Sequence, residues 1–193
     1  RELVKDESKK DELIGTSFWL KIMGTLGVLV ILSIAVNLTS NDAYTNMLVF
    51  IIASATIFQS FNVIDFYFQS KVISKFSVYA NVISLFATSL VKIVLVLNEA
   101  PLIAFVWVVL FDSFVLACGF IYFFIKNNSN FNIQKLKFNK IIAINLLKDS
   151  WPLILSGIVV SIYMRIDQVM IKEMINGEAV GQYAVAVRLS EAW

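Results

Sequence analysis

The sequence of 193 residues contains no histidine and only one cysteine. Without histidine, a catalytic site that depends on this side chain is excluded within the chain. Cys118 has no second cysteine as a disulfide partner, and its apolar surroundings favour the interpretation of a small buried side chain. Zinc sites are built mainly from cysteine and histidine, so we predict no metal site and no bound cofactor.

Charge is also scarce: 16% of the residues are Asp, Glu, Lys or Arg, whereas 59% are hydrophobic. Soluble domains are typically about 45–50% apolar and about 25% charged. The composition therefore indicates a membrane protein. Because the chain starts at Arg1 and stops at Trp193 within an apolar pattern, we expect it to be an internal part of a longer protein.

Long apolar runs divide the sequence into candidate membrane helices. A spanning helix needs about 20 mostly apolar residues. Four complete candidates occupy residues 13–38, 44–68, 76–97 and 101–125. A fifth is predicted over residues 152–175, with Ser150 as a cap and Pro152 in its first turn, and a sixth over 178–193 is cut off. The predicted fold class is all-α, a polytopic transmembrane helical bundle.

Among the connections between these helices, only alternate ones carry lysine or arginine. They lie before the first helix, after the second and after the fourth (Arg1, Lys5, Lys9, Lys10; Lys71, Lys75; Lys126, Lys135, Lys137, Lys140, Lys148). The other connections have none. Cytoplasmic loops are enriched in these residues, so the pattern predicts that the basic connections are cytoplasmic.

The connection at residues 126–151 is the longest break between apolar runs. Phe138, Ile142 and Leu146 recur at helical spacing, with lysines among the polar positions. This pattern is typical of an amphipathic helix lying on a membrane surface. We therefore predict a first group of helices at residues 1–125 and a cytoplasmic amphipathic connection at residues 126–151. Residues 152–193 are predicted to be the start of a second group.

Polar residues follow single faces of two predicted helices. One face carries Ser77, Asn81, Ser84, Thr88 and Lys92; another carries Gly157, Ser161, Arg165, Gln168 and Lys172. Asp112 lies in the middle of the fourth helix, Asp167 in the fifth and Glu191 in the sixth. A charge at the bilayer centre costs about 2.5–3.5 kcal/mol on insertion scales, so it usually faces protein or water.

Two interpretations of these polar faces remain open. Serine and threonine stripes are often simple helix contacts, and lysines near helix ends can extend to the membrane surface. The alternative is a hydrated cavity. Its cations, Arg165 and Lys92, would bind a phosphate or pyrophosphate, and its carboxylates, Asp167, Asp112 or Glu191, would couple to protons or sodium. Ser161, Gln168, Asn81 and Thr88 would line it.

Three segments resemble a known transporter family. They are residues 148–157 (Lys-Asp-Ser-Trp-Pro-Leu-Ile-Leu-Ser-Gly), 163–171 (Tyr-Met-Arg-Ile-Asp-Gln-Val-Met-Ile) and 178–191 (Glu-Ala-Val-Gly-Gln-Tyr-Ala-Val-Ala-Val-Arg-Leu-Ser-Glu). Residues 58–70 and 1–5 are also similar. The resemblance is to O-antigen and polysaccharide flippases of the Wzx type, in the superfamily that includes multidrug/toxin extruders and the lipid II flippase.

The resemblance implies a function and a setting. Such proteins have 12 to 14 helices in two lobes. By alternating access, they move an undecaprenyl-pyrophosphate-linked oligosaccharide, such as an O-antigen or capsule repeat unit, from the cytoplasmic to the periplasmic leaflet of the bacterial inner membrane. It also implies that Arg188 is a cavity cation. Membrane lipids and other polysaccharide-assembly proteins are the expected partners; nucleic acid is not expected.

Two alternative functions are weighed against this one. A multidrug/toxin extruder of the same fold should favour an acidic, aromatic cavity for organic cations, whereas the polar faces here carry Arg and Lys. A membrane-embedded acyltransferase is disfavoured by the absence of histidine. A glycan polymerase should carry a large periplasmic loop, but the predicted outer connections are short. Neither alternative enzyme is therefore preferred over a transporter without covalent chemistry.

Overall fold

A computed structural model describes residues 10–38, 42–127 and 138–191, and these ranges are helical without any strand. Within them, five helical stretches are long and apolar enough to cross a membrane: Asp11–Leu38, Ala43–Ser70, Lys75–Leu97, Leu102–Asn127 and Lys140–Met174. The predicted fold class is thereby confirmed: the chain is an all-α, multi-pass membrane protein. Its contacts divide it into two compact units, residues 1–143 and 144–193.

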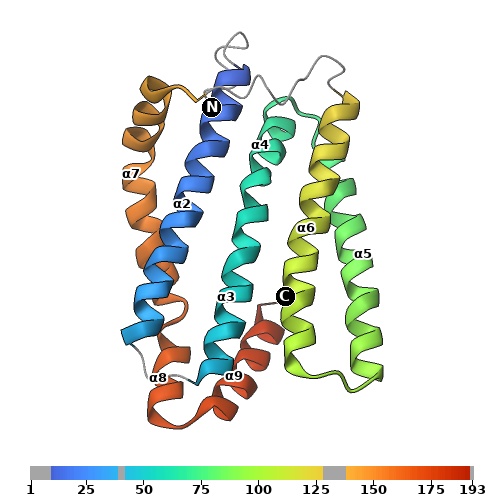
Figure 1. Cartoon of the computed structure of the whole chain (residues 1–193), viewed down its shortest axis with the longest axis vertical. Coiled ribbons are helices and arrows are strands. Elements are labelled where there is room, and N and C mark those ends of the chain that lie inside the picture. Colours follow the sequence, from blue (N-terminus) through green and yellow to red (C-terminus); the bar gives the residue numbers. More distant parts are fainter. Residues whose placement is uncertain (1–9, 39–41, 128–137, 192–193) are drawn as a thin grey trace. The chain divides into compact units, whose positions relative to one another are not determined.

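The first unit contains the four helical stretches that the apolar runs predicted. They are α2 (Lys10–Leu38), α3 (Ala43–Phe58) with α4 (Val63–Ser70), α5 (Lys75–Leu97) and α6 (Leu102–Asn127). Helix α6 contacts both α3 and α5, and α3 contacts α2 (Figure 1). The second stretch is not one uniform helix, because a 3₁₀ turn, η2 (Gln59–Asn62), separates α3 from α4. A 3₁₀ turn tightens the helix locally and shifts the register of its faces.

Aromatic side chains form the core of the first unit. Phe68, Phe120 and Phe124 are almost completely buried, and the Tyr67 and Phe124 rings meet edge to face with centroids 5.2 Å apart. Such edge-to-face pairs add about 0.5–1.5 kcal/mol beyond the area they bury. By contrast, much of the apolar surface of α2 and α5 is exposed, as expected for helices that contact lipid. Cys118 is exposed on α6, so its predicted burial is wrong.

Helix α7 (Lys140–Tyr163) starts well before the predicted position at Pro152. Its cap is Asn139, whose side-chain oxygen accepts hydrogen bonds from the backbone N–H groups of Ile141 and Ile142, at 3.0 and 3.4 Å. Asn139 thus satisfies N–H groups that the first helical turn leaves unpaired, the role predicted for Ser150. Pro152 lies inside the helix. Membrane helices often tolerate an internal proline, because neighbouring groups can bond the backbone carbonyl that the proline leaves unpaired.

Two hydrogen bonds attach the start of α7 to α2. The Asn139 backbone N–H donates to Thr16 Oγ1 at 3.0 Å, and the Asn139 side-chain amide donates to Glu12 Oε2 at 3.2 Å. Thr16 is fully buried and Ala143, in the first turn of α7, is nearly so. We call these three residues, Glu12, Thr16 and Asn139, the α2–α7 clasp. Residues 128–137 of the predicted amphipathic connection lie outside the described residues.

The predicted fifth helix, residues 152–175, is also interrupted. Helix α7 ends at Tyr163, Met164 and Arg165 form a turn, and α8 (Ile166–Met174) follows. The prediction of one continuous helix is therefore wrong at this point, and Arg165 lies at a helix junction. Helix α9 (Gly177–Ser190) packs against α8 after a short turn, and Asn176 caps it by accepting a hydrogen bond from the Ala179 N–H at 2.9 Å.

Candidate functional site

Arg165 occupies the break between α7 and α8. Its backbone N–H donates to the Ile162 carbonyl at 3.1 Å, an i→i−3 bond that replaces the i→i−4 ladder. The Val169 N–H then donates to the Arg165 carbonyl at 3.3 Å and starts the new helix. Arg165 follows the carboxyl end of α7 and is also the N-cap residue of α8, so it lies between the negative end of one helix and the positive end of the next. The break thus places a cation at the junction of two helices.

Asp167 and Tyr183 connect α8 to α9 beside this arginine. The Tyr183 hydroxyl donates to Asp167 Oδ2, and the Gln168 backbone N–H donates to Asp167 Oδ1 at 2.8 Å. Both carboxylate oxygens are therefore engaged. Arg165 Nη1 lies 3.5 Å from Gln168 Oε1, a long hydrogen bond. The guanidinium, which has five N–H donors, retains most of them for another acceptor.

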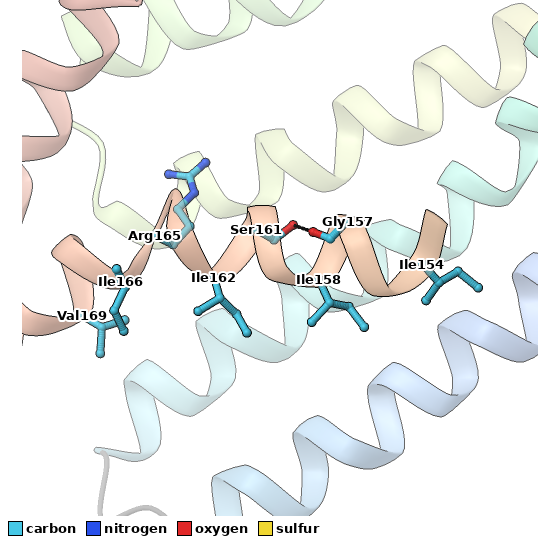
Figure 2. A pocket seen from close by; sticks show the side chains of 8 residues that line it. All are labelled: Ile154, Gly157, Ile158, Ser161, Ile162, Arg165, Ile166 and Val169. Carbon is cyan, nitrogen blue, oxygen red and sulfur yellow. Dashed lines mark hydrogen bonds between the residues drawn. The ribbon is translucent and has the colours of Figure 1, made fainter. Parts of the chain in front are cut away.

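A hollow of about 640 Å³ adjoins Arg165 in the second unit. Two neighbouring stripes of α7 and α8 line it: an apolar stripe (Ile154, Ile158, Ile162, Ile166, Val169) and a second stripe (Gly157, Ser161, Arg165). Figure 2 shows the isoleucines projecting from one side of the helix and Arg165 from another. The Ser161 hydroxyl donates to the Gly157 carbonyl at 2.7 Å, so it is satisfied within its own helix. Arg165 is the only charged residue among the described lining residues.

The other predicted residues of the second unit occupy different places. Asp167 belongs to the α8–α9 contact described above, and the Gln168 side chain accepts the long hydrogen bond from Arg165. Arg188 lies in the last turn of α9 and Glu191 follows as its cap; both are exposed, and neither is among the described residues that line the hollow. Their predicted roles as a cavity cation and a coupling carboxylate stay predictions.

In the first unit, part of the polar face of α5 lies against α6. Ser84 donates to Asp112 Oδ1 at 2.6 Å, and the buried Thr88 hydroxyl donates to the Ser84 carbonyl at 2.9 Å. These residues make the helix contact that was the plainer of the two interpretations. Asn81 is exposed and donates to the Ser77 carbonyl at 2.8 Å, and Lys92 is exposed near the end of α5. The predicted cavity roles of Asn81, Thr88, Lys92 and Asp112 stay predictions.

Tyr183 is a site residue that the sequence analysis did not identify. Asp167 and Tyr183 stand at similar distances on either side of the turn at Ile175 and Asn176. In two antiparallel helices joined by a short turn, such positions lie opposite each other. That symmetry could have identified the pair once the turn was located.

Among the described residues, no three His, Cys, Asp or Glu side chains are grouped closely enough to hold a metal ion.

The sequence pattern of a known family covers the whole chain. The family is described as polysaccharide biosynthesis protein, and the match extends over residues 1–193. No curated protein and no solved structure matches the chain. Since the match spans every membrane helix and the Arg165 site, the chain belongs to the polysaccharide biosynthesis protein family.

Proposed function

We propose that the protein is a flippase that moves an undecaprenyl-pyrophosphate-linked oligosaccharide from the cytoplasmic to the periplasmic leaflet. Three observations support this: the family membership, the five helices able to cross a membrane, and the cation at the helix break. Broken helices in secondary transporters typically supply the substrate site near the repeat interface. Translocation needs no covalent bond to be made or broken, so a transporter role fits a chain without histidine.

The observation that carries the proposal is Arg165 at the α7–α8 break beside the hollow. Asp149 is the last charged residue before the break, and the helical rise from it to Arg165 is about 24 Å. The hydrocarbon core is about 30 Å thick, so Arg165 lies at membrane depth, towards the end away from Asp149. A cation at that depth needs an anionic or hydrated partner. The pyrophosphate of the proposed substrate is such a partner, and guanidinium groups bind phosphate oxygens bidentately.

In the proposed cycle, the lobes of the complete protein alternate between openings to the cytoplasm and to the periplasm, and Arg165 holds the pyrophosphate meanwhile. The basic connections lie in the cytoplasm of a bacterial cell, and the membrane is the cytoplasmic membrane. Asp167 is the carboxylate that we favour for proton or sodium coupling, because it is the one next to Arg165. Protonation or cation binding there would compete with the hydrogen bond from Tyr183. Other polysaccharide-assembly proteins are the proposed partners.

The test is to neutralise Arg165 in the full-length protein and measure glycan export to the cell surface. A charge-assisted hydrogen bond contributes about 1.5–3 kcal/mol, so Arg165→Gln should lower export at least tenfold at limiting substrate. Arg165→Lys should retain part of it, because the charge stays while the bidentate geometry is lost. Lys172→Gln is the matched control, since Lys172 is exposed in the last turn of α8. Normal export by Arg165→Gln at normal protein level would refute the proposal.

A further inference from the structure

The hydrogen bond between Asp167 and Tyr183 lies in the contact between α8 and α9, where α9 folds back beside α8 (Figure 1). The less exposed residues recur at helical spacing on both helices: Asp167, Gln168 and Ile171 on α8, and Ala179, Val180, Tyr183, Ala184 and Val187 on α9. On α9 all of them except Tyr183 are apolar. Among the described residues, the bond from Tyr183 to Asp167 is the only side-chain hydrogen bond between the two helices.

The two oxygens of the Asp167 carboxylate are held in different ways. Oδ1 accepts a hydrogen bond from the Gln168 backbone N–H at 2.8 Å, within the first turn of α8. Oδ2 accepts one from the Tyr183 hydroxyl, on α9. The first bond stays with α8 wherever that helix moves, whereas the second depends on α9. Tyr183 therefore determines whether the carboxylate is held towards α9.

Arg165 lies two residues before Asp167, and its charge acts on this carboxylate. Within the part of the chain that the structure describes, the two side chains form no ion pair, and the guanidinium donates a long hydrogen bond to Gln168 Oε1 at 3.5 Å. A guanidinium pairs with a carboxylate as readily as with a phosphate, in both cases often through two parallel hydrogen bonds. Asp167 is therefore an internal competitor of any anion that binds Arg165.

We propose that Tyr183 is a positioning residue for the Arg165 site: its hydroxyl holds Asp167 towards α9, and this leaves the guanidinium free for the pyrophosphate. The inference rests on the proposed function, which supplies the pyrophosphate, and it adds a residue that controls binding through Asp167. When the bond from Tyr183 is lost, Asp167 pairs with Arg165 in place of the anion. A movement of α9 away from α8 during transport would release the substrate in this way.

The experiment measures the binding of radiolabelled undecaprenyl pyrophosphate to the full-length protein in detergent micelles. Tyr183→Phe removes the hydroxyl and keeps the ring, so the packing of α9 on α8 is retained. A competing ion pair at a partly exposed site should weaken binding about two- to fivefold. Tyr163→Phe is the matched control, because Tyr163 is a 79% exposed tyrosine at the end of α7, close to Arg165 in the sequence. It should bind the probe like the parent protein.

Asp167→Asn distinguishes positioning from a purely structural role of Tyr183. An asparagine cannot form an ion pair with Arg165, so Tyr183→Phe should have no effect on binding in a protein that already carries Asp167→Asn. A structural loss at the α8–α9 contact would weaken binding with either residue at position 167. Asp167→Asn alone should bind the probe at least as tightly as the parent protein. Weaker binding by Asp167→Asn, equal weakening by Tyr183→Phe in both backgrounds, or parent-like binding by Tyr183→Phe alone would each overturn the proposal.

The two proposals fail in different ways. If Arg165→Gln lowers export and probe binding while Tyr183→Phe binds like the parent protein, the positioning role is wrong and the flippase proposal stands. If Arg165→Gln exports normally, the flippase proposal fails whatever Tyr183→Phe does. Folding of each variant is checked by its unfolding midpoint in detergent, so that a loss of affinity is not confused with a loss of structure.

Discussion

The α2–α7 clasp makes a quantitative prediction for Thr16→Val. Thr16 is fully buried and accepts the Asn139 backbone N–H at 3.0 Å. Valine has nearly the shape of threonine, so packing is retained while the acceptor is lost. An unpaired buried N–H costs about 1–3 kcal/mol. Valine recovers part of this because it carries no hydroxyl to bury, so we expect the start of α7 to be destabilised by about 1–2 kcal/mol.

Thr25→Val is the control, because it is the same substitution on the same helix. The Thr25 hydroxyl donates to the Lys21 carbonyl within α2, at 3.0 Å. Removing it leaves no donor unpaired, so its effect should stay within about 0.5 kcal/mol.

Hydrogen exchange of the Asn139 amide measures the effect of Thr16→Val directly. A loss of 1–2 kcal/mol corresponds to about a 5- to 30-fold rise in the open population, and exchange through local opening should accelerate by the same factor. The amides in the middle of α5 belong to other contacts and should keep their exchange rates. If the Asn139 amide exchanges equally fast in Thr16→Val and Thr25→Val, the clasp does not hold the start of α7, and the reasoning is refuted.

Three further predictions concern the first unit, each measured by reversible unfolding in SDS-containing mixed micelles. Ser84→Ala should destabilise by about 0.6–1.5 kcal/mol, because Ser84 donates to Asp112 on α6 and membrane interhelical hydrogen bonds contribute about 0.6 kcal/mol on average and at most about 1.7. Ser89→Ala, later on the same helix, should change little. Gly119→Leu should cost about 1–3 kcal/mol, because a Cβ there already lies 3.2 Å from a side chain of α5; Gly24→Leu, in open space, should not destabilise. Val72→Gly should stabilise by about 0.5–1 kcal/mol, because Val72 has φ 58°. A destabilised Val72→Gly, or equal effects within either pair, would contradict these assignments.

The positions of α2 to α6 were predictable from the sequence because the bilayer imposes a length on them. An uncharged run of about 20 residues has few alternatives to a spanning helix. The predicted ranges therefore end within a few residues of the observed ones, for example 76–97 against Lys75–Leu97. The 3₁₀ turn at Gln59–Asn62 was not predicted, because its residues continue the apolar and polar pattern of the flanking helices.

The start of α7 shows how two valid local signals can compete. Asn139 is a good cap residue, and so is Ser150, which has Pro152 in the favourable first-turn position after it. The prediction placed the start of the helix at the cap followed by proline. The structure uses Asn139, which is the one tied to Thr16 and Glu12, far away along the chain. Such long-range bonds are invisible to local patterns, so only the folded structure distinguishes the two caps.

The placement of Arg165 depends on that outcome. A helix that began at Pro152 and ran to residue 175 would hold Arg165 near its middle, where a charge is hardest to accommodate. The observed α7 begins at Lys140 and ends at Tyr163, so Arg165 follows its carboxyl end. There the dipole of α7 favours a cation and that of α8, of which Arg165 is the N-cap, opposes it. The break contains neither glycine nor proline, so no local signal announced it. The polar face predicted Arg165 as a binding cation, and this role stays a prediction; the folded backbone adds that Arg165 lies at a junction between two helices.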